Sequence, residues 1–567
     1  MRHQKNLLIV YGVKEVDISS FGEVYIYKLS SCKIFSKNQF IILNDPEKLD
    51  RISDIERDKF SDWVFKQGQH YLYKNFRKLL NFDCFRFGDF SSMRNEIYPT
   101  YNLICNLLLI KEKIREHNIF SVKLIGFPIN IEIIFKSYLQ KKINVINKLN
   151  FLNFIFSKLR NVFIFLRTLG SSFLFLIKLF FSFIYLKIYK FNDYDIRSKK
   201  DLNFFLTRFP LHFSDSEVDE KYTSLFCENG VYLMDLISDG IHQNLSFKEY
   251  SESVKRLRKF KSNVVLLDNY INIYDFLKIA LKIPFIIILY ILLLSKKYTY
   301  YGINISSLIS YEQIYSMSKN IRLLSIVPKI NKISNAINFS KFYFTLFEFP
   351  YGKLISNYIN KNKSCETIGV QHGPSTRRKL FHFVPDNSNN KFLNYKFIPK
   401  KVLCEDLYSF KIYSEAKYKN IEIMDTIFRL AYLNKIQKNK NANMKVIFGG
   451  LHDTNEILIE LEDFLREKKE KFFFKPHPRS VLSKNSIKLI ERLPNLFITN
   501  DHPSKVLPKC KLVISTYSSI AIEAMNMSID LGIVDIPGLV NLSPLSDKEF
   551  ILNNLSKSTV IFFSRSD

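Results

Sequence analysis

The chain has 567 residues, a formal net charge of +29 and 83 Lys and Arg against 54 Asp and Glu. Its length excludes a single hydrophobic core, so we expect two α/β domains or slightly more. The basic excess favours a polyanion or an anionic membrane as partner. Because Lys, Asn, Ile, Phe and Tyr are all abundant, as AT-rich coding would produce, genomic background explains the excess equally well.

The amino terminus predicts a cytoplasmic protein. The apolar run from Leu7 to Val13 is short and has no small-residue cleavage site, so we interpret it as a β-strand and not as a signal peptide. The seven cysteines are scattered, without a C-x-x-C pair or His at zinc-ligand spacing. They indicate free thiols in a reducing compartment.

The first part of the chain alternates strand-like and helix-like segments. Strands are predicted from Leu7 to Tyr11, Val24 to Leu29 and Val122 to Phe127, with a helix from about Tyr101 to Glu116. This alternation is typical of a parallel sheet with crossover helices.

Two apolar blocks, Phe151 to Tyr189 and Ile273 to Leu294, interrupt the alternation. The longest uncharged run of the first block, Thr168 to Ile177, is too short to cross a hydrocarbon core of about 30 Å. Buried core helices and a transmembrane pair are both open interpretations. Because nearly all charges along the blocks are basic, we favour a monotopic surface, with Phe and Leu in the bilayer and Lys and Arg against anionic headgroups.

The α/β pattern then resumes. Strands are predicted from Val264 to Asp268 and from Phe342 to Phe347, and the Asn-, Lys- and Tyr-rich segment from Asp386 to about Lys440 should carry helices and a linker. A strand from Lys445 to Phe448 and an amphipathic helix from Thr454 to Lys468 begin a further domain. We therefore expect an acceptor-side α/β domain with the apolar inserts (1–365), a His-Gly loop and linker (366–440) and a nucleotide-binding α/β domain (441–567).

Three polar loops follow three short apolar runs of the later chain. Gln371-His372-Gly373 follows the run that ends at Val370, Lys475-Pro476-His477-Pro478-Arg479 follows Phe474, and Ser515 to Ser519 follows Ile514. Open α/β sheets bind ligands at the carboxyl ends of their strands. We expect the three loops to converge on one crevice and to form a nucleotide site.

Two strand–helix turns offer groups for a phosphate. The glycines of Gly449-Gly450 would let backbone amides approach a ligand, although an ordinary turn capped by Asp453 or Thr454 fits equally well. The run from Ser515 to Ser519 has more hydroxyls than one helix cap needs, so we expect Ser515, Ser518 and Ser519 to cradle a phosphate without metal. Glu523 would bond ribose hydroxyls, or is simply an exposed helix residue.

Two histidines are candidate functional groups. Prolines on both sides of His477 fix its direction, and Lys475 before it and Arg479 after it would meet an anion. An imidazole titrates near neutrality, so His372 would accept a proton from a sugar hydroxyl as general base, or would hydrogen-bond the donor. Gln371, Arg377 and Arg378 are expected to contact the acceptor or a phosphate.

The motifs stand in the order Glu348-Phe349-Pro350, Ile368 to Gly373, Lys475 to Pro478, Ser515 to Ser519 and Glu523-Ala524. This order resembles bacterial surface-carbohydrate transferases of capsule and lipopolysaccharide synthesis with the GT-B fold. It is more distantly similar to CDP-glycerol glycerophosphotransferases and to transferases that use CMP-activated ulosonic acids. The resemblance covers about Phe342 to Pro537.

The resemblance implies two Rossmann-like domains that face a cleft. It also implies that His372 is the base, that His477 contacts a cytidine nucleotide, and that Ser518 and Ser519 hold its phosphate. Gln371 stands where the glycerophosphotransferases usually have an aromatic residue, which counts against a polyol-phosphate donor.

We therefore predict a glycosyltransferase, peripheral on the inner face of the cytoplasmic membrane, with a CMP- or CDP-linked donor and a glycan or lipid-linked acceptor. Asp193-Tyr194-Asp195 has the Asp-x-Asp pattern of a metal-binding motif, but it lies far from the loops in sequence. We therefore expect a metal-independent transfer that needs no cofactor. Glu348 is the reserve base. A CDP-polyol phosphotransferase and a non-catalytic assembly protein are alternatives, whereas nucleic-acid binding lacks a recognition motif.

Overall fold

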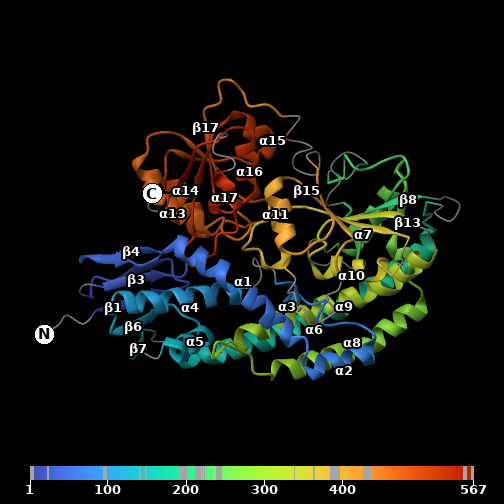
Figure 1. Ribbon diagram of the computed structural model, residues 1–567, viewed down its shortest axis with the longest axis horizontal. Helices are drawn as coiled ribbons and strands as arrows, with labels where there is room; N and C mark the ends of the chain where they lie inside the picture. Colours follow the sequence, from blue (N-terminus) through green and yellow to red (C-terminus); the bar gives the residue numbers. More distant parts are fainter. Residues whose placement is uncertain are drawn as a thin grey trace.

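Three large parallel sheets flanked by helices form most of the protein (Figure 1). Two small sheets of two strands each accompany them, β2 (Glu15–Asp17) with β4 (Lys33–Phe35), and β11 (Thr299–Tyr300) with β12 (Ile303–Asn304). Figure 1 shows the third sheet and its helices in orange and red above the blue first sheet, with the second sheet to the right. The structure is a computed structural model. It describes residues 5–21, 24–93, 99–139, 142–146, 150–191, 193–194, 201–210, 213, 217, 219, 221–222, 224–237, 245–336, 339–361, 364–383, 396–424, 433, 436–552 and 558–563.

The first sheet has the strand order β5-β3-β1-β6-β7, and every neighbouring pair is parallel. Helices α1 (Pro46–Gln67) and α4 (Pro99–Glu116) belong to this part of the chain. The strands and the helix predicted here are confirmed. The strands are β1 (Asn6–Val10), β3 (Val24–Lys28), β5 (Phe40–Ile42), β6 (Ser121–Ile125) and β7 (Lys142–Ile146).

The second sheet has the order β10-β9-β8-β13-β14-β15-β16 and is also parallel throughout. The domain boundary predicted after residue 365 falls between β13 and β14, which pair in register, so the His-Gly loop shares a sheet with earlier strands. The strands are β8 (Leu202–Thr207), β9 (Gly230–Met234), β10 (Val264–Leu266), β13 (Phe339–Phe344), β14 (Glu366–Val370), β15 (Lys401–Cys404) and β16 (Ile421–Ile423).

Strands β15 and β16 lie inside the segment where the sequence predicts helices and a linker. They are only four and three residues long, and Lys, Asn and Tyr surround them, so no alternating pattern marks them. One helix, α11 (Leu407–Glu415), does lie in this segment. Residues 386–395, 425–432 and 434–435 of the same segment lie outside the described residues.

The third sheet has the order β19-β18-β17-β20-β21-β22. Numbered along the chain, this is the 3-2-1-4-5-6 order of a Rossmann sheet. The predicted α/β class with Rossmann-like parallel sheets is thus confirmed, but the chain before residue 441 contains two such sheets. The strands are β17 (Met444–Phe448), β18 (Phe472–Lys475), β19 (Leu496–Ile498), β20 (Cys510–Ser515), β21 (Asp530–Ile533) and β22 (Val560–Phe562), with α13 (Glu456–Glu467) and α16 (Ser519–Asn526).

The two apolar blocks form the helices α6 (Asn150–Tyr189) and α8 (Ile273–Leu294), which lie with α9 (Ser306–Ala336) on the side of the molecule away from the third sheet (Figure 1). Both are long and apolar enough to cross a membrane by length and composition. Each has one buried face and one exposed apolar face. In α8, the buried face consists of Ile279, Ile283, Ile286, Tyr290 and Leu293, and the exposed face of Tyr274, Leu277, Leu281, Phe285, Ile288 and Leu292.

Candidate functional site

The ends of three neighbouring strands of the third sheet are aligned. Phe448 of β17 stands opposite Lys475 of β18 and Ser515 of β20. Neighbouring strands of a sheet are about 5 Å apart, so the loops that follow these strands lie side by side. Between β17 and β20 the strand order reverses, which is where open α/β sheets bind ligands. The predicted convergence holds for these loops, whereas the loop with His372 follows β14 in the second sheet.

The Gly449-Gly450 turn folds back onto its own residues. A Cβ atom on Gly449 would lie 2.6 Å from Thr454 Oγ1, and one on Gly450 would collide with the Asp453 carboxylate. Ser480 Oγ also donates to the Leu451 carbonyl at 2.7 Å. The two glycines are therefore required by the packing of the turn, whatever ligand it meets.

Asp453 is a further candidate site residue, beyond its predicted part as a possible helix cap. Its side chain is fully buried. Burial raises the pKa of Asp453 to about 6, and the Thr516 side chain offsets only part of this effect. The signal in the sequence is an acid directly after Gly-Gly-Leu-His at a strand end.

Four buried polar atoms gather at this point. Both Asp453 carboxylate oxygens, Ser515 Oγ and Thr516 Oγ1 are buried, and the Thr516 hydroxyl and the Gly450 backbone lie close enough to the Asp453 carboxylate to lower its pKa. Buried hydroxyls and a carboxylate that converge on one point are groups with which a polar ligand can hydrogen-bond. The cluster lies between β17 and β20, at the reversal of strand order.

His477 is held in one tautomer. Its Nδ1 accepts the backbone N–H of Arg479 at 3.2 Å, which leaves Nε2 as the donating nitrogen. Burial lowers the pKa of His477, and the positive charges of Arg479, His452 and Lys475 lower it further. His477 is therefore a neutral donor at pH 7. His452 is a neighbour that the sequence analysis does not single out.

Helix α16 begins as the sequence predicts. Ser518 is its N-cap, and Ser518 Oγ accepts from Ile520 N at 3.4 Å. Ser519 is the first helical residue, so free backbone amides point to the carboxyl edge of the sheet. The alternative that Glu523 is an exposed helix residue is wrong, since its side chain is only 6% exposed.

Gln371 braces the loop after β14. Its Nε2 donates to the Gly373 carbonyl at 2.8 Å and to Ser409 Oγ at 3.1 Å, while its Oε1 accepts from Glu405 N at 2.9 Å. The side chain is buried and its amide bonds within the protein, so it positions the loop. Its contact with the acceptor or a phosphate stays a prediction.

His372 is held by the same loop. Its ring packs edge-on against Phe349, with ring centroids 5.6 Å apart. Apart from the two chain neighbours His372 and Pro374, no described atom lies within 4 Å of the position that a Cβ on Gly373 would take. The loop therefore has open space at Gly373, the residue that follows His372.

Glu348 does not face a cleft. Its side chain is buried, its Oε1 accepts from the Tyr413 hydroxyl at 3.0 Å, and His382 Nδ1 lies 3.4 Å from the same oxygen. A turn follows β13, in which Leu346 has a φ of 58°. The role of Glu348 as a reserve base stays a prediction.

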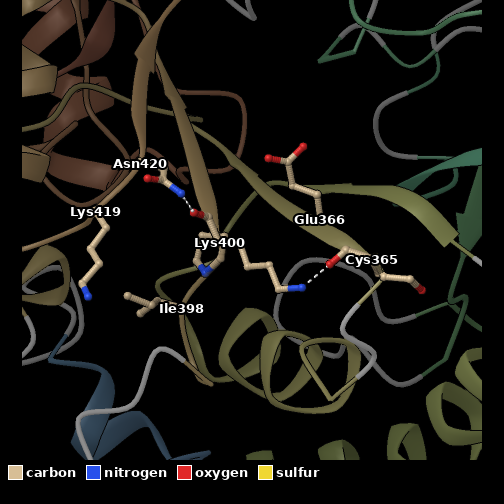
Figure 2. Close-up of a pocket in the computed structure, with 8 residues that line it drawn as sticks. Cys365, Glu366, Ile398, Lys400, Lys419 and Asn420 are labelled. Carbon is tan, nitrogen blue, oxygen red and sulfur yellow. Dashed lines mark hydrogen bonds between the residues drawn. The ribbon is translucent and has the colours of Figure 1, made fainter.

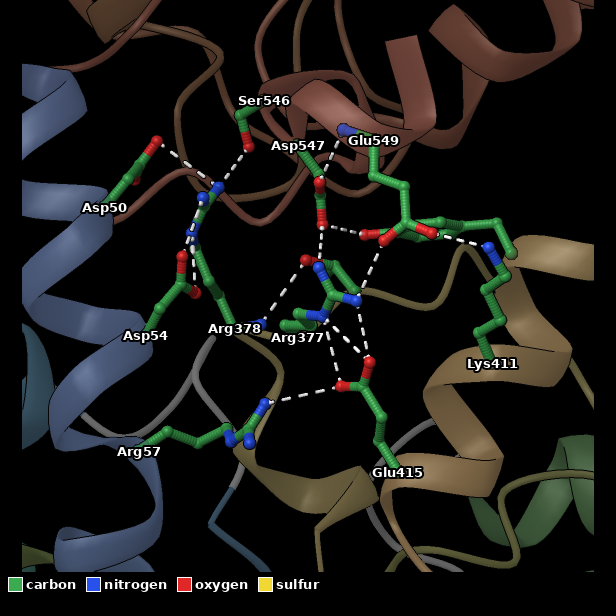
Figure 3. Close-up of polar contacts among 12 residues, drawn as sticks. Asp50, Asp54, Arg57, Arg377, Arg378, Lys411, Glu415, Ser546, Asp547 and Glu549 are labelled. Atoms are coloured by element: carbon green, nitrogen blue, oxygen red, sulfur yellow. Dashed lines mark hydrogen bonds and ion pairs between the residues drawn. The ribbon is translucent and has the colours of Figure 1, made fainter. Parts of the chain in front are cut away.

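Arg377 and Arg378 hold three parts of the chain together (Figure 3). Arg377 pairs with Glu415 of α11 at 2.7 Å and with Asp547 and Glu549 near the carboxyl terminus at 3.3 and 3.0 Å. The hydrogen bond with Glu415 is the main reason why the pKa of Arg377 is raised. Carboxylates thus occupy a guanidinium that the sequence analysis assigns to a phosphate.

Arg378 makes the corresponding link to the first part of the chain. It pairs with Asp50 and Asp54 of α1 at 3.3 and 3.2 Å (Figure 3). The side chains of Arg378 and Asp50 are only 7% and 3% exposed. In this structure carboxylates thus surround Arg378 as well, and the acceptor or phosphate contacts of Arg377 and Arg378 stay predictions.

The reversal point of the second sheet, between β8 and β13, is filled by the protein itself. The hydroxyl of the buried Tyr222 donates to the Leu206 carbonyl at 2.8 Å and accepts from Thr345 N at 3.1 Å. A cavity of about 450 Å³ does open on this sheet, but Cys365, Glu366, Lys400 and Asn420 line it at the amino ends of the strands (Figure 2). That is the edge opposite to His372.

Among the residues that the structure describes, no group of three His, Cys, Asp or Glu side chains is placed to hold a metal ion. Metal independence stays a prediction.

No protein-family model matches the chain, and no curated protein matches it. Among solved structures, it is similar to MurG of Acinetobacter baumannii, with a TM-score of 0.33 and 8% identity over 65% of this chain and 87% of that chain. It is also similar to CalG4, the calicheamicin glycosyltransferase, with a TM-score of 0.33 and 10% identity over 64% and 86% of the two chains. Likeness at this level carries no argument for function.

Proposed function

We propose that this protein is a GT-B-type glycosyltransferase of bacterial surface polysaccharide synthesis. It transfers a sugar from a nucleotide donor, with cytidine favoured, to a glycan or lipid-linked acceptor. The observation that carries the proposal is the cluster of buried polar atoms of Asp453, Ser515 and Thr516 at the strand-order reversal of the third sheet. This is where a Rossmann sheet binds a nucleotide.

The donor phosphate would meet the amino terminus of α16 at Ser518 and Ser519, where backbone amides and the helix dipole favour an anion. The neutral His477 would donate from Nε2, and Lys475 and Arg479 would supply positive charge. Glu523 would accept from the ribose hydroxyls. No metal is needed to neutralise the leaving phosphate in this arrangement.

The reaction would be a direct displacement at the anomeric carbon. The acceptor oxygen forms a bond to that carbon, the bond from the carbon to the phosphate oxygen breaks, and His372 takes the acceptor proton. The open space beside Gly373 supports this role. The proposal requires the carboxyl edges of the second and third sheets to face one cleft.

The exposed apolar faces of α6 and α8 support attachment to a membrane. Each helix packs its other face into the protein core, so lipid cannot surround it as it surrounds a transmembrane helix. Large exposed apolar patches on proteins mark interaction sites. We infer that both helices lie in the inner leaflet of the cytoplasmic membrane without crossing it.

Thermal unfolding of the purified protein with CMP, CDP, UDP and GDP tests the nucleotide site. We expect a cytidine nucleotide to raise Tm most, because a ligand that binds only the folded state stabilises it by mass action. Excess EDTA should leave this shift unchanged. Absence of a shift with all four nucleotides would contradict the proposal.

A further inference from the structure

Helix α2 (Tyr71–Leu80) exposes a row of cations. Lys74, Arg77 and Lys78 are all exposed, and the helix contains no acidic residue. Lys74 and Lys78 are four residues apart, so they lie on one face of the helix, one turn from each other. Arg77 pairs with Asp83 at 3.6 Å and is still 53% exposed. The outer face of α2 is therefore basic, mainly through Lys74 and Lys78.

Helix α2 runs along the second half of α8 in the opposite direction. Lys282 Nζ of α8 donates to the Leu80 carbonyl at the end of α2, at 2.6 Å. Lys296 Nζ, just after α8, donates at 3.0 Å to Oε1 of Gln67, which lies shortly before α2 begins. The ten residues of α2 span about 15 Å. Figure 1 shows the two helices side by side, away from the third sheet.

The exposed faces of the two helices point outward together. Leu72 and Tyr73 of α2 and Ile283 and Ile286 of α8 are buried in the same hydrophobic core. Because both helices pack on one core, their opposite faces lie next to each other at the surface. The basic row of α2 therefore borders the exposed apolar face of α8.

The second half of α8 has no charge of its own. No charged residue occurs from Ile283 to Leu294, and Phe285, Ile288 and Leu292 are exposed there. A helix face of this kind sinks about 5 to 10 Å into the boundary between the headgroups and the acyl chains of a bilayer. Lysines beside it can lay their stems on apolar surface and keep their ammonium groups among the headgroups. Helix α2 supplies the cations that this half of α8 lacks.

We propose that α2 recognises anionic phospholipid headgroups, through Lys74 and Lys78, while α8 inserts its apolar face beside them. A bilayer with negatively charged headgroups is complementary to a row of cations next to an apolar ridge, in charge and in polarity. The inference rests on the membrane attachment in the proposed function. It adds which lipids this surface prefers and which residues select them.

Vesicle sedimentation with the purified full chain tests the role of α2. The vesicles are phosphatidylcholine alone and phosphatidylcholine with phosphatidylglycerol. The test variant carries Lys74→Gln and Lys78→Gln. The matched control carries Lys484→Gln and Lys488→Gln, which also removes two exposed lysines four residues apart, from α14 (Lys484–Arg492) beside the third sheet. Lysine and glutamine have similar helix propensities, so both proteins should fold.

We expect the wild type to bind vesicles with phosphatidylglycerol more tightly than phosphatidylcholine alone. Each cation close to an anionic surface contributes about fivefold in affinity, so the α2 variant should lose about twentyfold to thirtyfold on the anionic vesicles. It should bind phosphatidylcholine alone as the wild type does. The control should keep wild-type affinity for both vesicles. High salt should reduce the difference between the wild type and the α2 variant, because it screens surface charges.

Wild-type affinity of the α2 variant for anionic vesicles would overturn the role of α2 and leave the membrane attachment intact. An equal loss in the control variant would do the same, because it would reduce the effect to net charge. A wild type that binds neither vesicle would overturn the attachment and the inference together, and a dimer in that case would assign the apolar faces to a second copy of the chain.

Discussion

The second and third sheets share one strand order but differ at the point where it reverses. In the second sheet Tyr222 closes this point with two hydrogen bonds, and Glu348 nearby is paired with Tyr413. In the third sheet the buried side chains of Asp453, Ser515 and Thr516 lie at this point, and no described hydroxyl bridges the two strands as Tyr222 does. Strand order thus shows where a ligand can bind, and a side chain that bridges the two strands distinguishes the filled point from the open one.

The largest expected effect concerns the base. His372→Ala should lower single-turnover rate by about 10² to 10⁴ and leave donor affinity unchanged, because a general base acts mainly in the transition state. Glu348→Gln, which changes a buried and partnered carboxyl, is the comparison variant. If His372→Ala keeps near-normal turnover while a folded Glu348→Gln protein is inactive, the general base is Glu348 and not His372.

The next effect concerns the arginines that follow the His372 loop. Arg378→Ala should lower the free energy of unfolding by about 3 to 5 kcal/mol, because it removes the positive charge that pairs with the buried carboxylate of Asp50. Arg51→Ala on the same helix is the control. Arg51 is 70% exposed and pairs with Glu47 at the surface, so its loss should cost about 1 kcal/mol or less.

Urea unfolding measures both values. An Arg378→Ala protein of wild-type stability that binds nucleotide more weakly would show that Arg378 contacts a phosphate after all.

The open region should gain stability when its buried acid is removed. The folded pKa of Asp453, about 6, lies above its ordinary value of 3.8, so folding is favoured by the protonated form and is penalised as pH rises from 3.8 through 6. Asp453→Asn should therefore stabilise the protein by about 1 to 3 kcal/mol near pH 8, and by less near pH 5.

Chemical denaturation at the two pH values gives the comparison. The same Asp453→Asn variant should bind nucleotide more weakly if the carboxyl serves a ligand. A gain that is equal at both pH values would contradict a raised pKa.

The smallest expected effects concern two glycines, Gly369 in β14 and Gly373 in the loop that follows it. A Cβ on Gly369 would lie 2.6 Å from the Phe347 ring, so Gly369→Ala should cost about 1 to 3 kcal/mol of stability. Gly373→Ala meets open space and should change stability by about 0.5 kcal/mol or less, while turnover falls because the methyl group occupies the acceptor's space. Unchanged turnover in Gly373→Ala would place the acceptor elsewhere.

The loops of the third sheet could be predicted from the sequence because each depends on local signals. A short apolar run ends in a turn, and Ser518 then caps a helix, so β18, β20 and α16 fall where the pattern indicates. The hydroxyl run and the Pro-flanked His477 were sufficient to locate the candidate site.

The roles of the arginines and of Glu348 could not be predicted in this way. Asp54, the partner of Arg378, is 324 positions away in the chain, and Tyr413, the partner of Glu348, is 65 positions away. Which groups a buried side chain contacts depends on how whole sheets pack. The second sheet could not be predicted in full, because its strands β15 and β16 are too short to show a strand pattern in the sequence.

The most direct measurement is the dissociation constant of the most stabilising nucleotide for the wild type, His477→Ala and Glu348→Gln. Loss of the Nε2 donor in His477→Ala should weaken binding by about 1.5 to 3 kcal/mol, or roughly tenfold to more than a hundredfold. Glu348→Gln, in the filled region, should bind as the wild type does. Unchanged affinity in a folded His477→Ala protein, or a loss confined to Glu348→Gln, would contradict a nucleotide site on the third sheet.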